Sequence, residues 1–168
     1  ITRPEAVFYP SDYLINARLK KSILSCFELV CPDAPDEAYD TSFKVLDIAL
    51  SVLEKSSAAY HNVEHTSLVT QCGLDIIEAI SLKIGKLNSE DLTSYIAALL
   101  CHDIGYVRGI CQQDNNHKQI ISLDGKFIDL EEYSTDASLT PYHVERGKIF
   151  VEERISEFPL INVEKVKK

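Results

Sequence analysis

Residues 89–103, SEDLTSYIAALLCHD, join an apolar run directly to a His-Asp pair. The apolar side chains recur with a period close to 3.6 residues, at Leu92, Ile96, Ala97, Leu99 and Leu100. This period predicts an α-helix that is buried on most sides. Ser89 is its predicted N-cap. The helix should therefore carry His102 and Asp103 near its carboxyl end.

The same periodicity predicts further helices on both sides of this stretch. They are expected over residues 11–30, 36–56, 62–84 and 142–157, with a last short piece ending in Lys165 to Lys168. Asp36 is the predicted cap of the second helix, and Gly85 is expected to end the third. Thr140-Pro141 supplies a cap and a first-turn proline for the fifth.

Residues 105–136 are polar and interrupted, and their alternation is too weak to predict strands. A long loop with short helical turns is expected there. The predicted fold class is therefore all-α, a compact bundle of about six helices with a long loop after the His-Asp pair. We expect a single domain over residues 1–168. Because the chain begins with Ile1 and not Met, it is open whether the chain is a fragment of a longer protein, truncated at its carboxyl end.

Composition limits the class of partner and compartment. Seventeen basic and twenty-six acidic residues give a formal charge of −9, which disfavours nucleic acid as a partner. The five cysteines form no CxxC pair, so a reducing, cytoplasmic compartment is predicted. No apolar run reaches the roughly 18–20 residues that span a bilayer, so no membrane association is expected. The sequence does not indicate an oligomeric state.

Two short segments bring together residue types that bind metal ions. His61 and His65 are four residues apart, so on a helix they share one face. His102 and Asp103 are adjacent, and adjacent side chains can meet one ion near a helix end. Imidazoles with a carboxylate suit one or two divalent ions, such as Zn²⁺, Mn²⁺, Fe, Ni or Mg²⁺. For any single histidine a structural role is the commoner one, but the clustering favours a metal.

These segments resemble a known family. Tyr60-His61-Asn62 and His65, followed by Ala98-Leu99-Leu100-Cys101-His102-Asp103-Ile104-Gly105, resemble the HD superfamily of metal-dependent phosphohydrolases. The Tyr-His-Asn start is similar to the cyclic-nucleotide phosphodiesterase branch. The resemblance covers mainly residues 60–106, with a fainter echo in residues 136–143.

The resemblance implies a role for each residue that matches the motifs. His65, His102 and Asp103 would bind metal, and Asp103 would bridge two ions. His61 would be the general acid and, with Asp103, carry the catalysis. Asn62 would orient His61 or close the site. His143 would contact substrate phosphate or a second metal, although a role as an ordinary surface residue is equally open.

One feature of the family is missing. Its first metal normally gains an aspartate from a later helix, and no aspartate follows His143. Two alternatives stay open: the last ligand lies beyond Lys168 in a longer chain, or the site is incomplete. The aspartates Asp114, Asp124, Asp129 and Asp136 all fall in the predicted loop. His117 lies in the same loop and is expected to be structural.

Three functions are consistent with this sequence. The first is a phosphohydrolase that uses metal-activated water on a small phosphorylated substrate of nucleotide or cyclic-nucleotide type. The second, motivated by the missing aspartate, is a non-catalytic regulatory module that binds metal or nucleotide. The third is a helical interaction domain with no site, which leaves the placement of the His-Asp pair unexplained.

Overall fold

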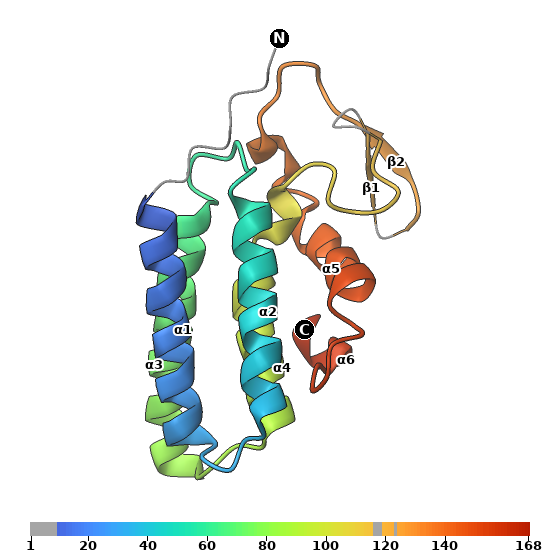
Figure 1. Ribbon diagram of the computed structural model, residues 1–168. Coiled ribbons are helices and arrows are strands. Elements are labelled where there is room, and N and C mark those ends of the chain that lie inside the picture. Colours follow the sequence, from blue (N-terminus) through green and yellow to red (C-terminus); the bar gives the residue numbers. More distant parts are fainter. Residues whose placement is uncertain (1–9, 116–118, 123) are drawn as a thin grey trace.

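Four long helices form an up-and-down bundle in the computed structural model, which describes residues 10–115, 119–122 and 124–168 (Figure 1). They are α1 (Pro10–Val30), α2 (Asp36–Leu53), α3 (Val63–Ile84) and α4 (Ser89–Cys101). Helix α1 packs against α2 and α3, and α4 packs against the same two helices. The carboxyl end of α4 and the amino end of α3 therefore meet at one end of the bundle.

The second half of the chain covers that end and one side of the bundle (Figure 1). Its elements are η1 (Ile104–Tyr106), β1 (Gln119–Ile121), β2 (Phe127–Asp129), η2 (Asp136–Leu139), α5 (His143–Arg154) and α6 (Val163–Val166). The predicted all-α fold of about six helices is confirmed.

The sequence predicted no strands in the region after the His-Asp pair, but the structure has two short ones there. Strands β1 and β2 pair antiparallel, with Ile120 opposite Ile128. Each strand has only three residues, which is too short for alternation to be visible in the sequence. Ile120 is buried in a small apolar cluster, and this burial stabilises the hairpin. The expected helical turns do occur, as η1 and η2.

Three predicted helix caps were wrong. Asn88, not Ser89, caps α4, because its side-chain oxygen accepts a hydrogen bond from the Asp91 backbone N–H at 2.8 Å. Pro35 is the N-cap of α2, and Asp36 lies inside the first turn. There its negative charge interacts favourably with the helix dipole. Tyr142 precedes α5 in place of Thr140, which follows η2.

Two predicted helix ends were also displaced. Helices α2 and α5 end at Leu53 and Arg154, three residues earlier than predicted in each case. The predicted end of α3 is confirmed: Gly85, with a φ of 87°, occupies the left-handed region that glycine tolerates best.

The main hydrophobic core lies between the four long helices. Its largest fully buried apolar side chains include Phe27, Leu46, Leu74, Ile96 and Leu100. Leu100 belongs to the apolar run that ends at the His-Asp pair. Burying this run therefore fixes the position of the carboxyl end of α4.

Helix α5 is tied to the chain just after the His-Asp pair. The fully buried Arg146 guanidinium donates hydrogen bonds to the Gly105 carbonyl at 3.0 Å and the Val107 carbonyl at 2.9 Å. Arg146 also pairs with the buried Asp114 carboxylate at 2.8 Å. A Cβ on Gly105 would lie 1.8 Å from the His143 carbonyl oxygen. Only glycine therefore permits this close approach of α5 to η1.

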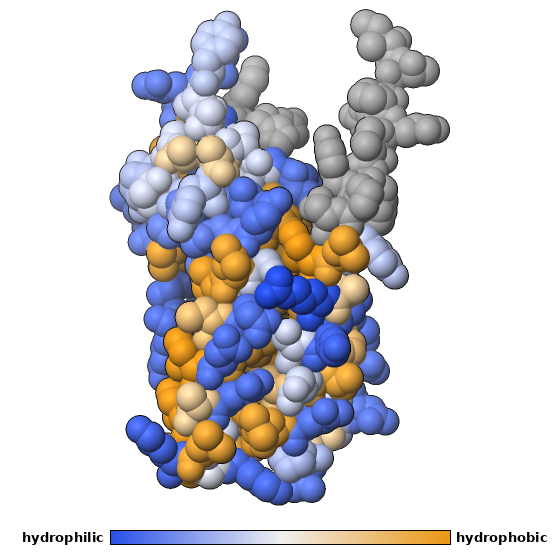
Figure 2. Space-filling model, turned by 90° about the vertical axis from the view of Figure 1, so that its left-hand side faces the viewer, coloured by the Kyte–Doolittle hydropathy of each residue, from blue (hydrophilic) through white to orange (hydrophobic). Residues whose placement is uncertain are grey.

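The face over α1 and α3 carries hydrophobic side chains between hydrophilic ones (Figure 2). On α3 the exposed apolar residues include Leu68, Ile76 and Ile80. In the part of the chain that the structure describes, no helix has the length and hydrophobicity needed to cross a membrane.

Candidate metal centre

The candidate site lies where the amino end of α3 meets the carboxyl end of α4. Asn62 is the N-cap of α3, and its side-chain oxygen accepts a hydrogen bond from the His65 backbone N–H at 3.0 Å. This cap fixes where the helix begins, and so places His65 in the first turn and His61 just before it. On the other side, His102 is the C-cap of α4 and Asp103 has already left the helix, with a φ of −108°. His102 and Asp103 therefore lie at a helix end, where two adjacent side chains can face the same site.

Three imidazoles converge on one carboxylate oxygen. Asp103 Oδ2 lies 2.7 Å from His61 Nδ1, 3.2 Å from His65 Nε2 and 3.2 Å from His102 Nε2. Ligand atoms of His61, His65 and Asp103 lie within 4.8 Å of one another. The structure thus brings together all four residues that the two sequence motifs contributed. His61 is as close to the cluster as the residues predicted to bind metal.

Hydrogen bonds set the charge of Asp103. Burial alone would raise the pKa of this carboxyl, but hydrogen bonds from His102 and His61 outweigh burial and lower the pKa to about 2. Asp103 is therefore ionised at neutral pH. An ionised carboxylate that is only 4% exposed needs positive partners or a cation.

The imidazoles of His65 and His102 differ in their surroundings. Burial lowers the pKa of His65, with smaller opposing and reinforcing effects from Asp103 and the other two histidines. Burial would also lower the pKa of His102, but its hydrogen bonds to Asp103 and the Leu99 carbonyl reverse the shift and raise it. His102 Nδ1 lies 2.8 Å from the Leu99 carbonyl oxygen, so its N–H donates there. Nε2 faces Asp103 Oδ2, and loss of the Nε2 proton would leave a lone pair there, as metal-binding histidines require.

His143 lies beside this cluster, at the start of α5. Its ring centroid is 6.5 Å from that of His61. His143 Nδ1 lies 2.7 Å from the Thr140 carbonyl oxygen, so Nε2 is the nitrogen available to a ligand. The two hydrogen bonds of the Asn62 side chain both go to backbone atoms, of Ala59 and His65. Asn62 therefore orients the histidines through the start of α3.

The loop aspartates are used elsewhere in the fold. Asp114 pairs with Arg146, and Asp136 accepts from the Ser57 backbone N–H at 2.8 Å and lies beside Arg108. Asp124 pairs with Lys126, and Asp129 accepts a hydrogen bond from Gln119. Within residues 10–115, 119–122 and 124–168, Asp103 is thus the one aspartate in the cluster. His117 lies outside the described residues.

Aromatic rings complete the surroundings of the histidines. Tyr106 stacks on His61, with ring centroids 4.0 Å apart and planes 14° apart, and the Tyr60 centroid is 4.5 Å from that of His65. No role was predicted for Tyr106 from the sequence. Its position directly after the His-Asp-Ile-Gly segment was the one available signal, since a residue so close to Asp103 cannot lie far from the site.

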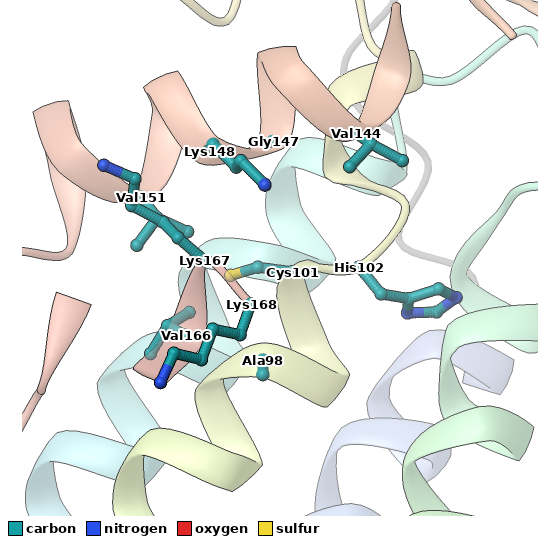
Figure 3. Close-up of a pocket in the computed structure, with 10 residues that line it drawn as sticks. All are labelled: Ala98, Cys101, His102, Val144, Gly147, Lys148, Val151, Val166, Lys167 and Lys168. Atoms are coloured by element: carbon teal, nitrogen blue, oxygen red, sulfur yellow. The ribbon is translucent and has the colours of Figure 1, made fainter. Parts of the chain in front are cut away.

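A separate pocket borders His102 between α4, α5 and the last residues of the chain (Figure 3). It has a volume of about 210 Å³. It is lined by Ala98, Cys101, His102, Val144, Gly147, Lys148, Val151, Val166, Lys167 and Lys168. Figure 3 shows the His102 ring turned away from the three lysines. Of the four clustered residues, this pocket is lined by His102 alone and not by His61, His65 or Asp103.

Comparison with known proteins identifies the family. A family model described as Npun_R2479-like matches residues 14–168. The chain belongs to this family. No curated protein and no solved structure shows significant similarity to this Npun_R2479-like chain.

The cap of α3 in this Npun_R2479-like chain is open to a direct test. Replacing Asn62 with Ala should lower the free energy of unfolding by about 1 kcal/mol, because the His65 N–H loses its acceptor. Asn88→Ala is the matched control, since Asn88 caps α4 in the same way at the far end of the bundle. Urea denaturation should give similar losses for both. If the cluster binds a metal ion, the affinity for that ion should fall only in Asn62→Ala, and equal affinities in the two variants would contradict a positional role for Asn62.

Proposed function

We propose that this chain is a metal-dependent phosphohydrolase with an HD-type site. The convergence of three imidazoles on Asp103 Oδ2 is the observation that carries the proposal. The two motifs that contribute these residues resemble those of HD phosphohydrolases in residue type and order. A packing role alone does not account for three histidines around one buried carboxylate.

The residues present fit a divalent cation. His65, His102 and Asp103 would hold it, since they offer two imidazole nitrogens and an ionised carboxylate. The Leu99 carbonyl already accepts a hydrogen bond from His102 Nδ1 and so orients the ring, as carbonyls beside metal-binding histidines do. A bound divalent cation supplies Lewis-acid polarisation of the phosphoryl oxygens and lowers the pKa of water. The site would accept one or two ions of Zn²⁺, Mn²⁺, Fe, Ni or Mg²⁺.

His61 would act as the general acid. Its Nδ1 is held by Asp103 at 2.7 Å, so Nε2 is the nitrogen that can donate a proton. In phosphoester hydrolysis the oxygen of water bonds to phosphorus, the P–O bond to the leaving group breaks, and the leaving oxygen takes up that proton. The ionised Asp103 carboxylate stabilises the imidazolium before transfer.

The proposed substrate is a small phosphorylated molecule of nucleotide or cyclic-nucleotide type, handled in the cytoplasm. His143 would contact its phosphate through Nε2, because Nδ1 is already bonded to Thr140. The formal charge of −9 favours a small substrate over a nucleic acid.

Metal analysis tests the site first. Protein expressed with added metal and then desalted should carry about one or two equivalents of a divalent ion. The His102→Ala and Asp103→Ala double variant should carry none. Asp103→Asn should in addition abolish hydrolysis of bis(p-nitrophenyl) phosphate. Full activity in Asp103→Asn would refute the mechanism.

A second candidate is a non-catalytic module that binds metal or nucleotide. It is favoured by the pairing of Asp114 and Asp136 with arginines, which leaves Asp103 as the one described aspartate in the cluster. Retained metal and bound nucleotide without product over a long incubation would support this candidate. Metal-dependent turnover would exclude it.

A further inference from the structure

Tyr106 makes contacts that the metal ligands do not explain. It is only 2% exposed, and its ring is shared between two histidines. It stacks on His61 at a centroid distance of 4.0 Å and on His143 at 4.3 Å, with planes 14° and 20° apart. Neither histidine neighbours Tyr106 in sequence, so the fold brings the three rings together.

We infer that Tyr106 is a positioning residue for His61, an inference that rests on His61 being the general acid of the proposed function. The hydrogen bond to Asp103 holds one end of the His61 ring. A single hydrogen bond leaves the ring free to turn about the line that joins the two atoms. Stacking against Tyr106 fixes the plane of the ring. Together the two contacts fix the direction in which Nε2 points, as proton donation requires.

Backbone contacts hold Tyr106 itself in place. Its backbone N–H donates to the Asp103 carbonyl at 3.1 Å, so the stacking ring and the carboxylate belong to one short turn. Gly105 lets α5 approach this turn, and Arg146 fastens α5 to the carbonyl of Gly105. The position of α5 therefore determines how His143 lies against Tyr106, and Tyr106 in turn determines the plane of His61.

The ring of Tyr106, and not its hydroxyl, is the part that acts. In the described part of the chain the hydroxyl has no hydrogen-bond partner, whereas the ring faces both imidazoles. A phenylalanine at position 106 should therefore preserve the stacking on both imidazoles. Leucine would fill much of the same apolar space among Ala58, Ile120 and Leu139 but could not stack.

Three variants test this inference. Tyr106→Phe keeps the ring, and Tyr106→Leu keeps an apolar side chain without it. Leu139→Ala is the control, because it weakens the same apolar cluster without touching the histidine rings. Each protein is measured for metal content, for kcat and KM on diphenyl phosphate, and for the ring Hε1 resonance of His61 by NMR. The resonance that is missing from the spectrum of His61→Gln is assigned to His61.

Tyr106→Phe should keep kcat within about twofold of wild type and preserve the His61 resonance. Tyr106→Leu should keep its metal and KM but lose roughly 10- to 100-fold in kcat, because a small misplacement of a catalytic group is costly. Its His61 resonance should move, since the ring current of Tyr106 is gone.

Two results would overturn the inference: a His61 resonance unmoved in Tyr106→Leu, or an equal loss of kcat in Leu139→Ala. If the wild type hydrolyses no phosphoester, the proposed function fails separately. The NMR comparison then still tests the stacking of Tyr106 on His61, on which the inference rests.

Discussion

Replacing Arg146 with Met should lower the free energy of unfolding by about 3–5 kcal/mol, as expected when one partner of a buried ion pair is removed. The side chains of Arg146 and Asp114 are both 0% exposed, and their charged atoms are 2.8 Å apart. Without the guanidinium, the Asp114 carboxylate would stay buried with only the backbone N–H groups of Cys111 and Ile121 as donors. Urea denaturation at pH 7 measures the loss.

A double variant separates the pair from the rest of the Arg146 contacts. Arg146→Met with Asp114→Leu removes both charges, so it should recover part of the stability lost in Arg146→Met. The carbonyls of Gly105 and Val107 still lose their donor in both proteins. A double variant no more stable than Arg146→Met would mean that these carbonyl bonds, and not the unpaired carboxylate, account for the loss.

The same pair should make stability depend on pH in acid. Burial would raise the pKa of Asp114, but hydrogen bonds from Arg146 and from backbone N–H groups outweigh burial and lower it. A lowered folded-state pKa means that the pair stabilises the protein above the unfolded-state pKa of about 3.9. This stability is lost as the pH falls through the lower, folded-state value. The difference in stability between wild type and Arg146→Met should therefore narrow below about pH 4.

The long helices could be predicted from the sequence because each buries one side for many turns. Helix α3 begins and ends where its pattern indicated, at the Asn62 cap and at Gly85. Capping was harder to predict, because several adjacent residues can cap a helix. Asn88 and Ser89 are both good caps, and the choice depends on which side chain reaches the Asp91 N–H. The hairpin was missed because its three-residue strands depend on tertiary contacts of Ile120 and not on a repeating pattern.

The four residues of the cluster could be predicted because two short motifs contain them all. The residues that hold the cluster in place could not be predicted from the sequence. Tyr106, Arg146 and Gly105 act through contacts between η1 and α5, whose residues are about forty positions apart in the chain. No local spacing reveals such a contact. The fold therefore supplies what the motif lacks, which is a fixed orientation for each side chain of the site.

Removing His61 and removing His65 should have different effects, although both imidazoles contact the same carboxylate oxygen. His61→Ala should keep the metal and lose about 10²- to 10⁴-fold in kcat, because only the proton donor is gone. The loss should be larger for diphenyl phosphate than for bis(p-nitrophenyl) phosphate, since phenolate needs the proton more than p-nitrophenolate does. His65→Ala should lose metal and, with it, turnover of both esters alike. Elemental analysis and kinetics on the two esters separate these outcomes. Loss of metal from His61→Ala would instead make His61 a ligand, in keeping with its place within 4.8 Å of the His65 and Asp103 ligand atoms.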